Sequence, residues 1–130
     1  MTLVQQRERF SKDLFATQAT GVEIVEVGEH YCRCELVLQP HHRNAMGAVM
    51  GGVYFTIADF AFAVAANSEA LEWVSTESSI HYLSSAQSQK LVALTRCIRQ
   101  GSRCCLYEIE VSNEAGKLLA LVTTSGMKIN

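Results

Sequence analysis

Residues 51–66 read Gly-Gly-Val-Tyr-Phe-Thr-Ile-Ala-Asp-Phe-Ala-Phe-Ala-Val-Ala-Ala, and this stretch decides the fold. It is rich in alanine, and from Val53 onward only Thr56 and Asp59 interrupt the apolar run. Alanine favours the helix, and a helix that is apolar on all sides is normally buried. We therefore predict a helix that begins near Gly51, ends near Asn67 and is buried on nearly every side.

The segments around this helix have the patterns of strands and turns. Polar and apolar residues alternate over 31–38, which is the period of a half-buried strand, and residues 22–27 form a second strand-like run. Four further strands are expected after the helix, at 73–84, 89–100, 103–112 and 117–128. Turn residues at 100–102 and 113–116 connect neighbouring runs, so the pairing should be antiparallel.

The N-terminal segment and one loop complete the chain. Thr2 and Gln5 fit a capping box, and the helix that follows should run to about residue 18, before Gly21 breaks it. Pro40 ends the strand at 31–38, and residues 39–50 then form a loop of about 12 residues, a length typical of functional loops. A long sheet with a single very apolar helix in mid-chain indicates a sheet that curls around that helix, in one domain over residues 1–130.

The composition excludes several classes of protein. Eleven Lys and Arg against thirteen Asp and Glu give a net charge of −2, whereas nucleic-acid binding needs a basic excess. No apolar signal segment opens the chain, and the apolar helix is shorter than the ~20 residues that cross a bilayer. The five cysteines include no C-x-x-C pair, which indicates free thiols in a reducing cytoplasm. Only 18% of the residues are charged, against about 25% on average, which indicates surface buried against another subunit.

Asp59 is the strongest functional signal in the sequence. On a helix, its neighbours three and four residues away are Phe55, Thr56, Phe62 and Ala63. An unpaired carboxylate in such surroundings is energetically costly or has a shifted pKa. Two interpretations are open: a structural aspartate hydrogen-bonded to a loop amide or a cation, or a general base or nucleophile held in a dry pocket.

The pair Gly51-Gly52 stands at the predicted start of the helix. Helix N-termini suit anions because they present free N–H groups and the positive end of the helix dipole. Glycine also lets a ligand approach the backbone closely. On its own the pair fits a tight junction between loop and helix equally well, but acyl transfer needs both a base and an oxyanion site, so the pair and Asp59 reinforce each other.

The motif Asn44-x-x-Gly47-x-x-Met50-Gly51-Gly52, followed by Asp59, resembles the hotdog-fold acyl-CoA thioesterases of the phenylacetate-degradation type. That family carries N-x-x-G-x-x-H-G-G, with an acidic residue on the helix seven positions after the second glycine. The resemblance covers about residues 20–128, including the strand with residues 80–83. It implies an α+β hotdog fold, in which a curled antiparallel sheet wraps around a long central helix.

The resemblance also implies a set of site residues. Asp59 would be the general base or nucleophile, and the amide of Gly51 would bind the thioester carbonyl oxygen. Asn44 would orient the carbonyl or the attacking water, and Ser75 would help to position that water. Apart from what the resemblance implies, the residues expected to contact the substrate are Gly52, Met50, Phe55 and Arg99.

The chain departs from the family pattern at two positions. Met50 stands where the family usually has histidine. A thioether cannot donate a hydrogen bond as an imidazole can, so either that histidine is dispensable here or the activity is altered, weak or lost. Ser85 stands where many members have proline, and no function is inferred from it.

The spacing of Gly51 and Asp59 predicts a site built from two chains. They are eight residues apart, which is about 12 Å along a helix. A reacting carbonyl needs its nucleophile and its oxyanion donors within about 3.5 Å. A partner's helix supplies the missing contact if a two-fold axis brings its Asp59 opposite Gly51. We therefore expect two composite sites in a homodimer, and the resemblance implies the same arrangement, often as a dimer of dimers.

A possible metal cluster is set aside on geometric grounds. His30, Cys32 and Cys34 alternate, so they are expected on one strand face. Ligands on a flat strand converge poorly, and a metal site needs three or four converging ligands. We expect no metal and no cofactor.

A basic window lies near the predicted turn at 100–102. Arg96, Arg99 and Arg103 fall within eight residues that contain no acidic residue. The window fits a solvated hairpin end, or a patch for the phosphates of coenzyme A, for which arginine chemistry is suited.

Together these features predict hydrolysis of an acyl-CoA thioester to a carboxylic acid and free coenzyme A. The acyl group should be apolar or aromatic, because Tyr54, Phe55, Phe60 and Phe62 surround the proposed site. The alternative is a non-catalytic acyl-CoA-binding protein on the same fold, which Met50 favours. A dehydratase on this fold ranks lower, because it needs a histidine in the loop–helix motif.

Overall fold

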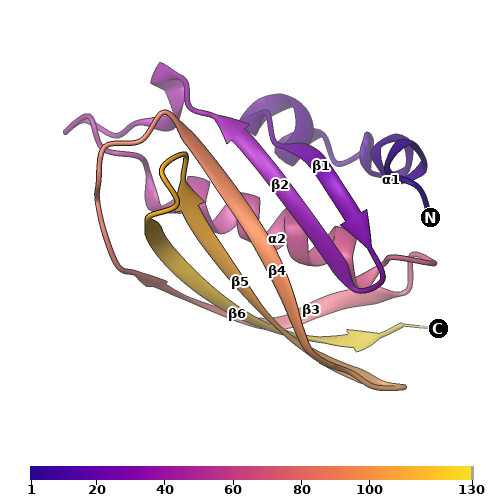
Figure 1. The fold of residues 1–130 in the computed structure, drawn as a ribbon. Helices are drawn as coiled ribbons and strands as arrows, with labels where there is room; N and C mark the ends of the chain where they lie inside the picture. The colour runs from indigo at the N-terminus through magenta and orange to yellow at the C-terminus, as the bar shows by residue number, and fades with distance from the viewer. Residues whose placement is uncertain (130) are drawn as a thin grey trace.

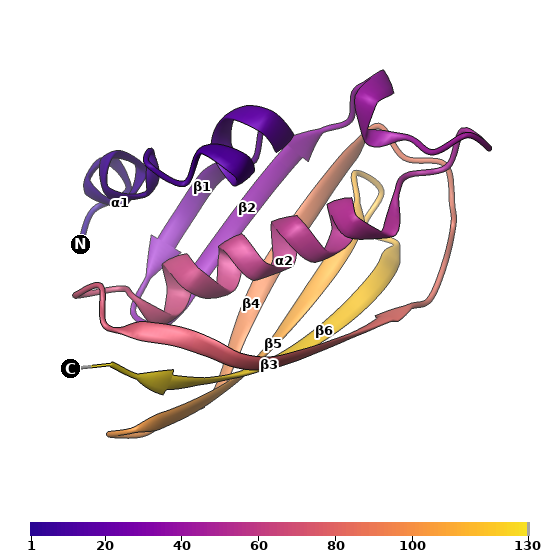
Figure 2. The ribbon, with the colours of Figure 1, turned by 180° about the vertical axis from the view of Figure 1, so that it is seen from behind.

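An antiparallel sheet forms most of the molecule. The computed structural model describes residues 1–129, and its six strands lie in the order β1-β2-β4-β5-β6-β3. The strands are β1 (Glu23–Gly28), β2 (Tyr31–Val37), β3 (Trp73–Tyr82), β4 (Lys90–Gln100), β5 (Cys104–Asn113) and β6 (Leu118–Lys128). The sheet curves around helix α2 (Gly51–Ala66), as Figures 1 and 2 show from two sides. The predicted α+β hotdog fold, a curled sheet around a long helix, is confirmed.

The chain crosses from one edge of the sheet to the other through α2. Strand β1 lies at one edge beside β2, and β3, which follows the helix, pairs with β6 at the opposite edge. The segment 83–89 returns the chain to β4 beside β2, and two hairpins then lead through β5 to β6. Within the described residues, β3 therefore pairs on one side, and its outer side carries the unpaired backbone groups of an edge strand.

Helix α2 packs on the concave face of the sheet with one side uncovered. Ile57, Ala61 and Ala65 face the core and are fully buried. The exposed and half-buried positions on the other side are Gly52, Phe55, Thr56, Asp59 and Ala63, which we call the open stripe. Figure 2 shows this side of α2 with no layer over most of its length. The prediction of a helix buried on nearly every side is wrong for the single chain, because the sheet covers one side of the helix.

The N-terminal segment is broken where one helix was predicted. Helix α1 (Leu3–Phe10) ends at Ser11, and a π-helical turn (Phe15–Thr20) follows after a gap. The Ser11 hydroxyl donates to the Glu8 carbonyl oxygen at 2.7 Å, and such competition for a backbone carbonyl interrupts helices. The predicted helix to about residue 18 is therefore wrong in its length, whereas Gly21 does end the segment, with a φ of 92°.

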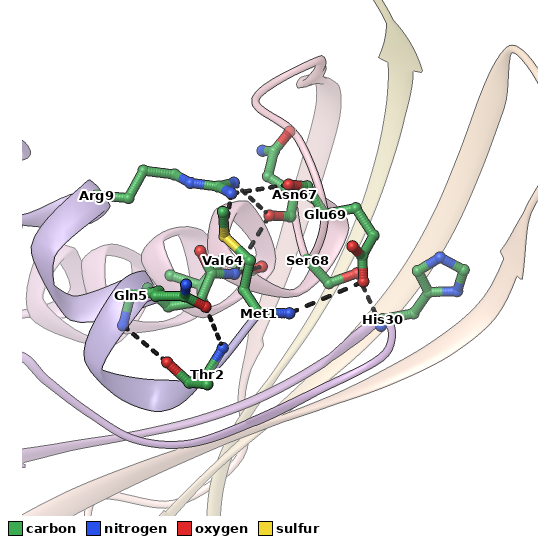
Figure 3. Close-up of polar contacts among 10 residues, drawn as sticks. Met1, Thr2, Gln5, Arg9, His30, Val64, Asn67, Ser68 and Glu69 are labelled. Atoms are coloured by element: carbon green, nitrogen blue, oxygen red, sulfur yellow. Dashed lines mark hydrogen bonds and ion pairs between the residues drawn. The ribbon is translucent and has the colours of Figure 1, made fainter.

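Helix α1 closes the C-terminal end of α2, and the capping box predicted at its own start is present. The Gln6 side-chain amide donates to the carbonyl oxygens of Val64 at 3.3 Å and Asn67 at 3.2 Å. Arg9 donates to the same Asn67 carbonyl at 2.9 Å, as Figure 3 shows. The last carbonyls of a helix have no partner within it, so these side chains satisfy groups that α2 leaves open.

The strands begin and end within two residues of the predicted positions. The largest difference is at β3, which ends at Tyr82 because the N–H groups of Leu83 and Ser84 both donate to the Leu119 carbonyl oxygen, at 2.8 and 3.2 Å. None of the helices within residues 1–129 combines the length and the apolar character needed to cross a membrane.

Candidate active site

Two pockets lie along α2, and the first is at its N-terminal end. It has a volume of about 860 Å³, and we call it the Gly51 pocket. Its walls come from the loop residues 46–49, from Gly51 and Tyr54 on α2, and from residues 82–87 after the helix. The pocket therefore joins the loop before α2 to the end of β3.

The second pocket lies at the middle of α2, over the open stripe. It has a volume of about 460 Å³, and we call it the Asp59 pocket. Residues 13–16 of the N-terminal segment form one wall, and the other wall is α2 with Phe55, Asp59 and Phe60. Apolar side chains thus surround a carboxylate in a shallow, open hollow.

The first turn of α2 leaves two backbone donors free. Met50 is the N-cap residue and makes no side-chain hydrogen bond to the helix, while its carbonyl oxygen accepts from the Val53 N–H at 3.0 Å. Among the described residues, the N–H groups of Gly51 and Gly52 have no hydrogen-bond acceptor. Free N–H groups at the positive end of a helix dipole can stabilise a negative oxygen.

The Asp59 carboxylate has no partner of opposite charge in its pocket. Within residues 1–129 it accepts no hydrogen bond and forms no ion pair, which argues against the structural interpretation of Asp59. The side chain is exposed in the single chain, so the prediction of a buried carboxylate is wrong at this level of assembly. Even so, the surrounding apolar atoms remove part of its water, and this desolvation raises the pKa of Asp59.

A second carboxylate, Asp13, lines the same pocket. It lies in the gap between α1 and the π-helical turn, and partial burial raises its pKa as well. After desolvation, the negative charge of Asp13 is the next cause of the raised pKa of Asp59, because like charges disfavour ionisation. The pocket therefore makes Asp59 a stronger base than a solvated carboxylate.

Gly51 and Asp59 do not share a pocket within one chain. They stand two helical turns apart, at the spacing of about 12 Å that eight residues impose. Within its described residues, one chain thus presents free N–H groups at one pocket and an unpaired carboxylate at another, and a single carbonyl group cannot contact both.

Asn44 shapes the loop that precedes α2. Its side-chain oxygen accepts from the N–H groups of Met46 at 2.9 Å and Ala48 at 3.1 Å. Gly47 in the same loop has a φ of 81°, which a glycine adopts without strain. The Asn44 side chain is exposed beside the Gly51 pocket, with its oxygen committed to the loop.

Ser75 and Arg99 lie away from both pockets. Ser75 is exposed on the edge strand β3, opposite Gly126 of β6. Arg99 is exposed near the end of β4, and its neighbour Gln100 donates to the Ala66 carbonyl oxygen at 3.0 Å, so this end of the strand passes the C-terminal end of α2. Of the basic window, Arg96 pairs with Glu108 at 2.8 Å on the exposed surface.

The aromatic residues of α2 divide between pocket and core. Phe55 and Phe60 line the Asp59 pocket, and Tyr54 lines the Gly51 pocket. Phe62 is 1% exposed and packs edge-on against Tyr107, with ring centroids 5.3 Å apart. The expectation that Phe62 surrounds the site is therefore wrong, because its position on the helix faces the sheet.

The cluster of His30, Cys32 and Cys34 is not arranged on one strand face. His30 occupies the β1–β2 turn with a φ of 52°, whereas the two cysteines are fully buried in β2 with their sulfur atoms 3.5 Å apart. The hydrogen bond to Cys32 and then burial raise the pKa of Cys34 well above its ordinary value, so this thiol stays protonated. No group of three or more metal-binding side chains occurs in residues 1–129.

Two residues of the pockets were not found from the sequence. Asp13 lies in a segment that reads as regular helix, and Tyr82 reads as an ordinary strand residue. Both residues are identified by their position beside α2 in the folded chain. The local pattern of polar and apolar residues does not predict such long-range contacts. Tyr82 donates its hydroxyl to the Gly51 carbonyl oxygen at 3.1 Å.

Comparison with known proteins defines the class. The family model of the thioesterase superfamily matches residues 46–120, which include the Gly51-Gly52 pair, Asp59 and strand β3. The chain belongs to the thioesterase superfamily. It is thus a thioester-hydrolysing enzyme of the hotdog fold, as the motif around Gly51 and Asp59 predicts.

Comparison with individual proteins shows which members of the thioesterase superfamily this chain resembles. The chain is 37% identical over 108 residues to a putative esterase of Archaeoglobus fulgidus, covering 82% of this chain and 70% of that protein. It is 30% identical over 105 residues to the acyl-coenzyme A thioesterase PaaI of Escherichia coli, covering 80% of this chain and 75% of that protein. The resemblance to thioesterases of the phenylacetate-degradation type is thereby confirmed.

Solved structures of thioesterases have the same fold as this chain. The E. coli PaaI protein from the phenylacetic acid degradation operon superposes with a TM-score of 0.86 at 25% identity, over 99% of this chain and 97% of that chain. A thioesterase from Haemophilus influenzae superposes with a TM-score of 0.88 over 100% of this chain and 92% of that chain; at 21% identity it bears on the fold alone.

Proposed function

We propose that this protein hydrolyses acyl-CoA thioesters with apolar or aromatic acyl groups, in a composite site at a dimer interface. The observation that carries the proposal is the division of the site within one chain. Free N–H groups stand at the Gly51 pocket, and an unpaired carboxylate stands at the Asp59 pocket, about 12 Å along the same helix. Each half is chemically incomplete without the other.

The exposed surfaces support assembly of the two halves. The open stripe of α2 carries Asp59, and β3 offers a ten-residue edge with unpaired backbone groups. A two-fold axis beside these surfaces places two α2 helices antiparallel, with the partner's Asp59 opposite Gly51. We propose a homodimer, or a dimer of dimers, as the active form.

The chemistry then follows from charge development in acyl transfer. The thioester carbonyl oxygen becomes negative as the carbon is attacked, and the Gly51 N–H stabilises it. The partner's Asp59 either removes a proton from the attacking water or attacks the carbon itself, forming an anhydride that water then hydrolyses. In both routes the C–S bond breaks, the thiolate of coenzyme A leaves and takes up a proton, and the acid is released. Asn44 and Ser75 are proposed to orient the carbonyl or the water.

The substrate class follows from the walls of the Asp59 pocket. Leu14 and Phe15 are 55% and 70% exposed there, and Phe55 faces them from α2. Exposed apolar side chains around a hollow of about 460 Å³ suit an apolar or aromatic acyl group. Gly52 and Met50, beside Gly51, are proposed to contact the thioester.

Arg99 is proposed to bind the phosphates of the coenzyme A whose thioester lies in the Gly51 pocket of the other subunit. It lies at the C-terminal end of α2, away from the Gly51 pocket of its own chain. In an antiparallel pair of helices, the C-terminal end of one passes the N-terminal end of the other, which brings the partner's Arg99 toward this pocket.

A panel of acyl-CoA thioesters tests the proposal. Loss of thioester absorbance is followed for aliphatic and aromatic substrates with the wild type and with Asp59→Asn, which keeps the shape of the side chain and removes the charge. Absorbance is preferable to a thiol reagent, because the five cysteines of the chain would react with it. We expect turnover by the wild type and a loss of kcat of at least about a hundredfold in the variant.

The alternative, a non-catalytic acyl-CoA-binding protein, gives a different result. It rests on Met50, which replaces the histidine of the family pattern. Binding of acyl-CoA by calorimetry without turnover across the panel would favour it over the enzyme. Equal turnover by wild type and Asp59→Asn would remove Asp59 from the mechanism.

A further inference from the structure

We propose that Tyr82 is a positioning residue that fixes the orientation of the Gly51–Gly52 peptide at the start of α2. The inference rests on the proposed function, in which the Gly51 N–H receives the oxyanion, and extends it: the Gly52 N–H, the second free donor of this turn, also receives the oxyanion. It concerns a residue outside the motif that carries the resemblance, on a different element of the fold.

Each peptide plane of the first turn is held through its carbonyl oxygen. The Met50 carbonyl accepts from the Val53 N–H at 3.0 Å, and the Gly52 carbonyl accepts from the Thr56 hydroxyl at 2.8 Å. The Gly51 carbonyl accepts from the Tyr82 hydroxyl at 3.1 Å. Two of these three donors, Val53 and Thr56, belong to α2 itself, whereas Tyr82 belongs to β3.

The Gly51–Gly52 peptide needs such a contact more than its neighbours. Both flanking residues lack a side chain, so their backbone dihedrals are the least restricted in the helix. The carbonyl of Gly51 and the N–H of Gly52 belong to one planar unit. Within the helix this oxygen also accepts from the Phe55 N–H, and the Tyr82 hydroxyl is a second donor that helps to fix the direction of the N–H on the other side of the peptide. That N–H has no acceptor within the described residues.

A side chain at residue 51 would also displace the exposed end of the Tyr82 ring from its present position. A Cβ atom at residue 51 would lie 2.8 Å from the Tyr82 hydroxyl oxygen and 3.0 Å from Cζ, which is too close for an undisturbed contact. A Cβ atom at Gly52 would meet no atom within 4 Å. The two glycines thus have different roles, since Gly51 makes room for Tyr82 and Gly52 leaves its amide open.

The ring itself is held in place by the sheet and by a second aromatic residue. Tyr82 is the last residue of β3 and pairs with Ala120 of β6. Its ring packs edge-on against that of Tyr54, with centroids 5.9 Å apart and an interplanar angle of 70°. The strand end therefore presents the hydroxyl at a defined point against α2.

Tyr82→Phe tests the inference because it removes the hydroxyl and keeps the ring. On the best substrate of the acyl-CoA panel, we expect kcat to fall about tenfold, the weight of one hydrogen bond in the transition state, while KM stays within about twofold. Tyr31→Phe is the matched control, since it removes a phenolic hydroxyl that binds Glu26 on another part of the surface. It should leave both constants unchanged, and both variants should unfold at the wild-type temperature.

A second measurement reads the peptide directly and does not depend on activity. We expect the ¹⁵N order parameter of the Gly52 amide to be near the rigid value of about 0.85 in the wild type and clearly lower in Tyr82→Phe, with no change in Tyr31→Phe. An unchanged kcat in Tyr82→Phe, a rise of KM alone, or an equally rigid Gly52 amide would overturn the role of Tyr82. If the wild type hydrolyses no thioester, the proposed function fails, and the order parameters alone decide whether Tyr82 holds this peptide.

Discussion

Asp59 combines a cost in stability with the chemical role proposed above. Its carboxylate stands among apolar side chains, and neither a cation nor a hydrogen-bond donor compensates it in the described residues. Desolvation and the neighbouring Asp13 raise its pKa, so the folded state holds the protonated form more tightly than the unfolded state does. A group of this kind lowers the stability of the fold once it is ionised.

Asp59→Asn should therefore raise stability while it removes activity. Because the folded pKa is raised, the favourable contribution of the protonated form is complete below the unfolded value of about 3.9 and is lost as pH rises through the folded pKa. The neutral amide does not suffer this loss, so we expect a Tm about 2 °C above the wild type at pH 7, and a difference that shrinks toward pH 4. Thermal unfolding by circular dichroism over this pH range measures it.

Glu29→Gln is the control for this pH series. Glu29 is an exposed carboxylate in the turn between β1 and β2, away from both pockets. Its neutralisation should change Tm little at any pH. A Tm of Asp59→Asn that falls below the wild type at pH 7 would contradict the assignment of a desolvated, unpaired carboxylate.

At the scale of the element, the N-terminus of α2 lacks the side-chain cap that would stabilise the helix. Met50 has the extended backbone of an N-cap, with φ −62° and ψ 140°, and gives the helix no side-chain acceptor. Ser, Thr, Asp or Asn at this position usually accepts a hydrogen bond from the second or third N–H of the helix. Because Met50 offers no side-chain acceptor, the second of these donors, the Gly52 N–H, stays free for a ligand in the described part of the chain, whereas the Val53 N–H donates to the Met50 carbonyl oxygen.

Met50→Asp should stabilise the helix and inhibit the enzyme. The new carboxylate accepts from the Gly52 or Val53 N–H and lies at the positive end of the helix dipole, which together contribute about 1 kcal/mol, or about 4 °C in Tm. The same carboxylate occupies and repels the place where the oxyanion forms, so we expect kcat/KM to fall at least about a hundredfold. Thermal unfolding and steady-state kinetics are measured on the same samples.

Met46→Asp separates the cap from a general effect of added charge. Met46 is 92% exposed in the same loop and is not at the N-cap. It should give no gain in Tm. If both variants are stabilised equally, or if Met50→Asp keeps full activity, the open amides of α2 have no special role.

At the scale of the whole molecule, a single chain has two surfaces that no other part of residues 1–129 covers. The first surface is the open stripe of α2, which carries the Asp59 carboxylate. The second is the outer side of β3, the strand that ends at Tyr82, whose hydroxyl contacts the start of α2. The charged fraction of 18% is low for a chain whose surface is all solvated. These features agree with a two-fold assembly in which each chain completes the other's site.

Mixed dimers test this assembly. We expect Asp59→Ala and Asn44→Ala to be inactive when each is alone. In a dimer of one of each, one site carries both substitutions and the other site is intact. The purified heterodimer should therefore recover about half of the wild-type activity per dimer, and an unpurified random mixture, in which half of the dimers are heterodimers, about a quarter. Co-expression with two affinity tags and an assay of the doubly purified dimer measures this recovery.

Two comparisons make the mixed-dimer result interpretable. Asn44 holds its loop through Met46 and Ala48, so Asn44→Ala must first show a wild-type unfolding transition. A mixture of wild type and Asp59→Ala should lose activity in proportion to the variant sites. No recovery in the heterodimer would mean that each site lies within one chain.

The elements of the fold were predictable because their signals are local. Alternation of polar and apolar residues placed β2 and the later strands within two residues, and the turn residues gave the antiparallel pairing. The prediction of one N-terminal helix is wrong because the Ser11 hydroxyl bonds to the Glu8 carbonyl oxygen and the helix ends there, and one serine within a helical pattern does not by itself mark such an end.

The site was predictable only in the part that lies on one segment. The sequence placed Gly51-Gly52 and Asp59 on a single helix and predicted their separation of about two turns, which the structure shows. The exposure of Asp59, the burial of Phe62 and the place of Arg99 depend on which side of α2 the sheet covers. Composition alone does not orient a helix that is apolar on all sides.

The sequence by itself determined the central helix and the strands, because hydrophobic periodicity and backbone propensity act between near neighbours. It also placed Gly51 and Asp59, the residues proposed for acyl transfer, on one helix. The tertiary structure alone decided that Asp13 faces Asp59 and that Tyr82 reaches the Gly51 carbonyl from 31 residues away. Such contacts arise where the curled sheet and the N-terminal segment meet α2, and the energies of desolvation and hydrogen bonding depend on those meetings rather than on the order of residues along the chain.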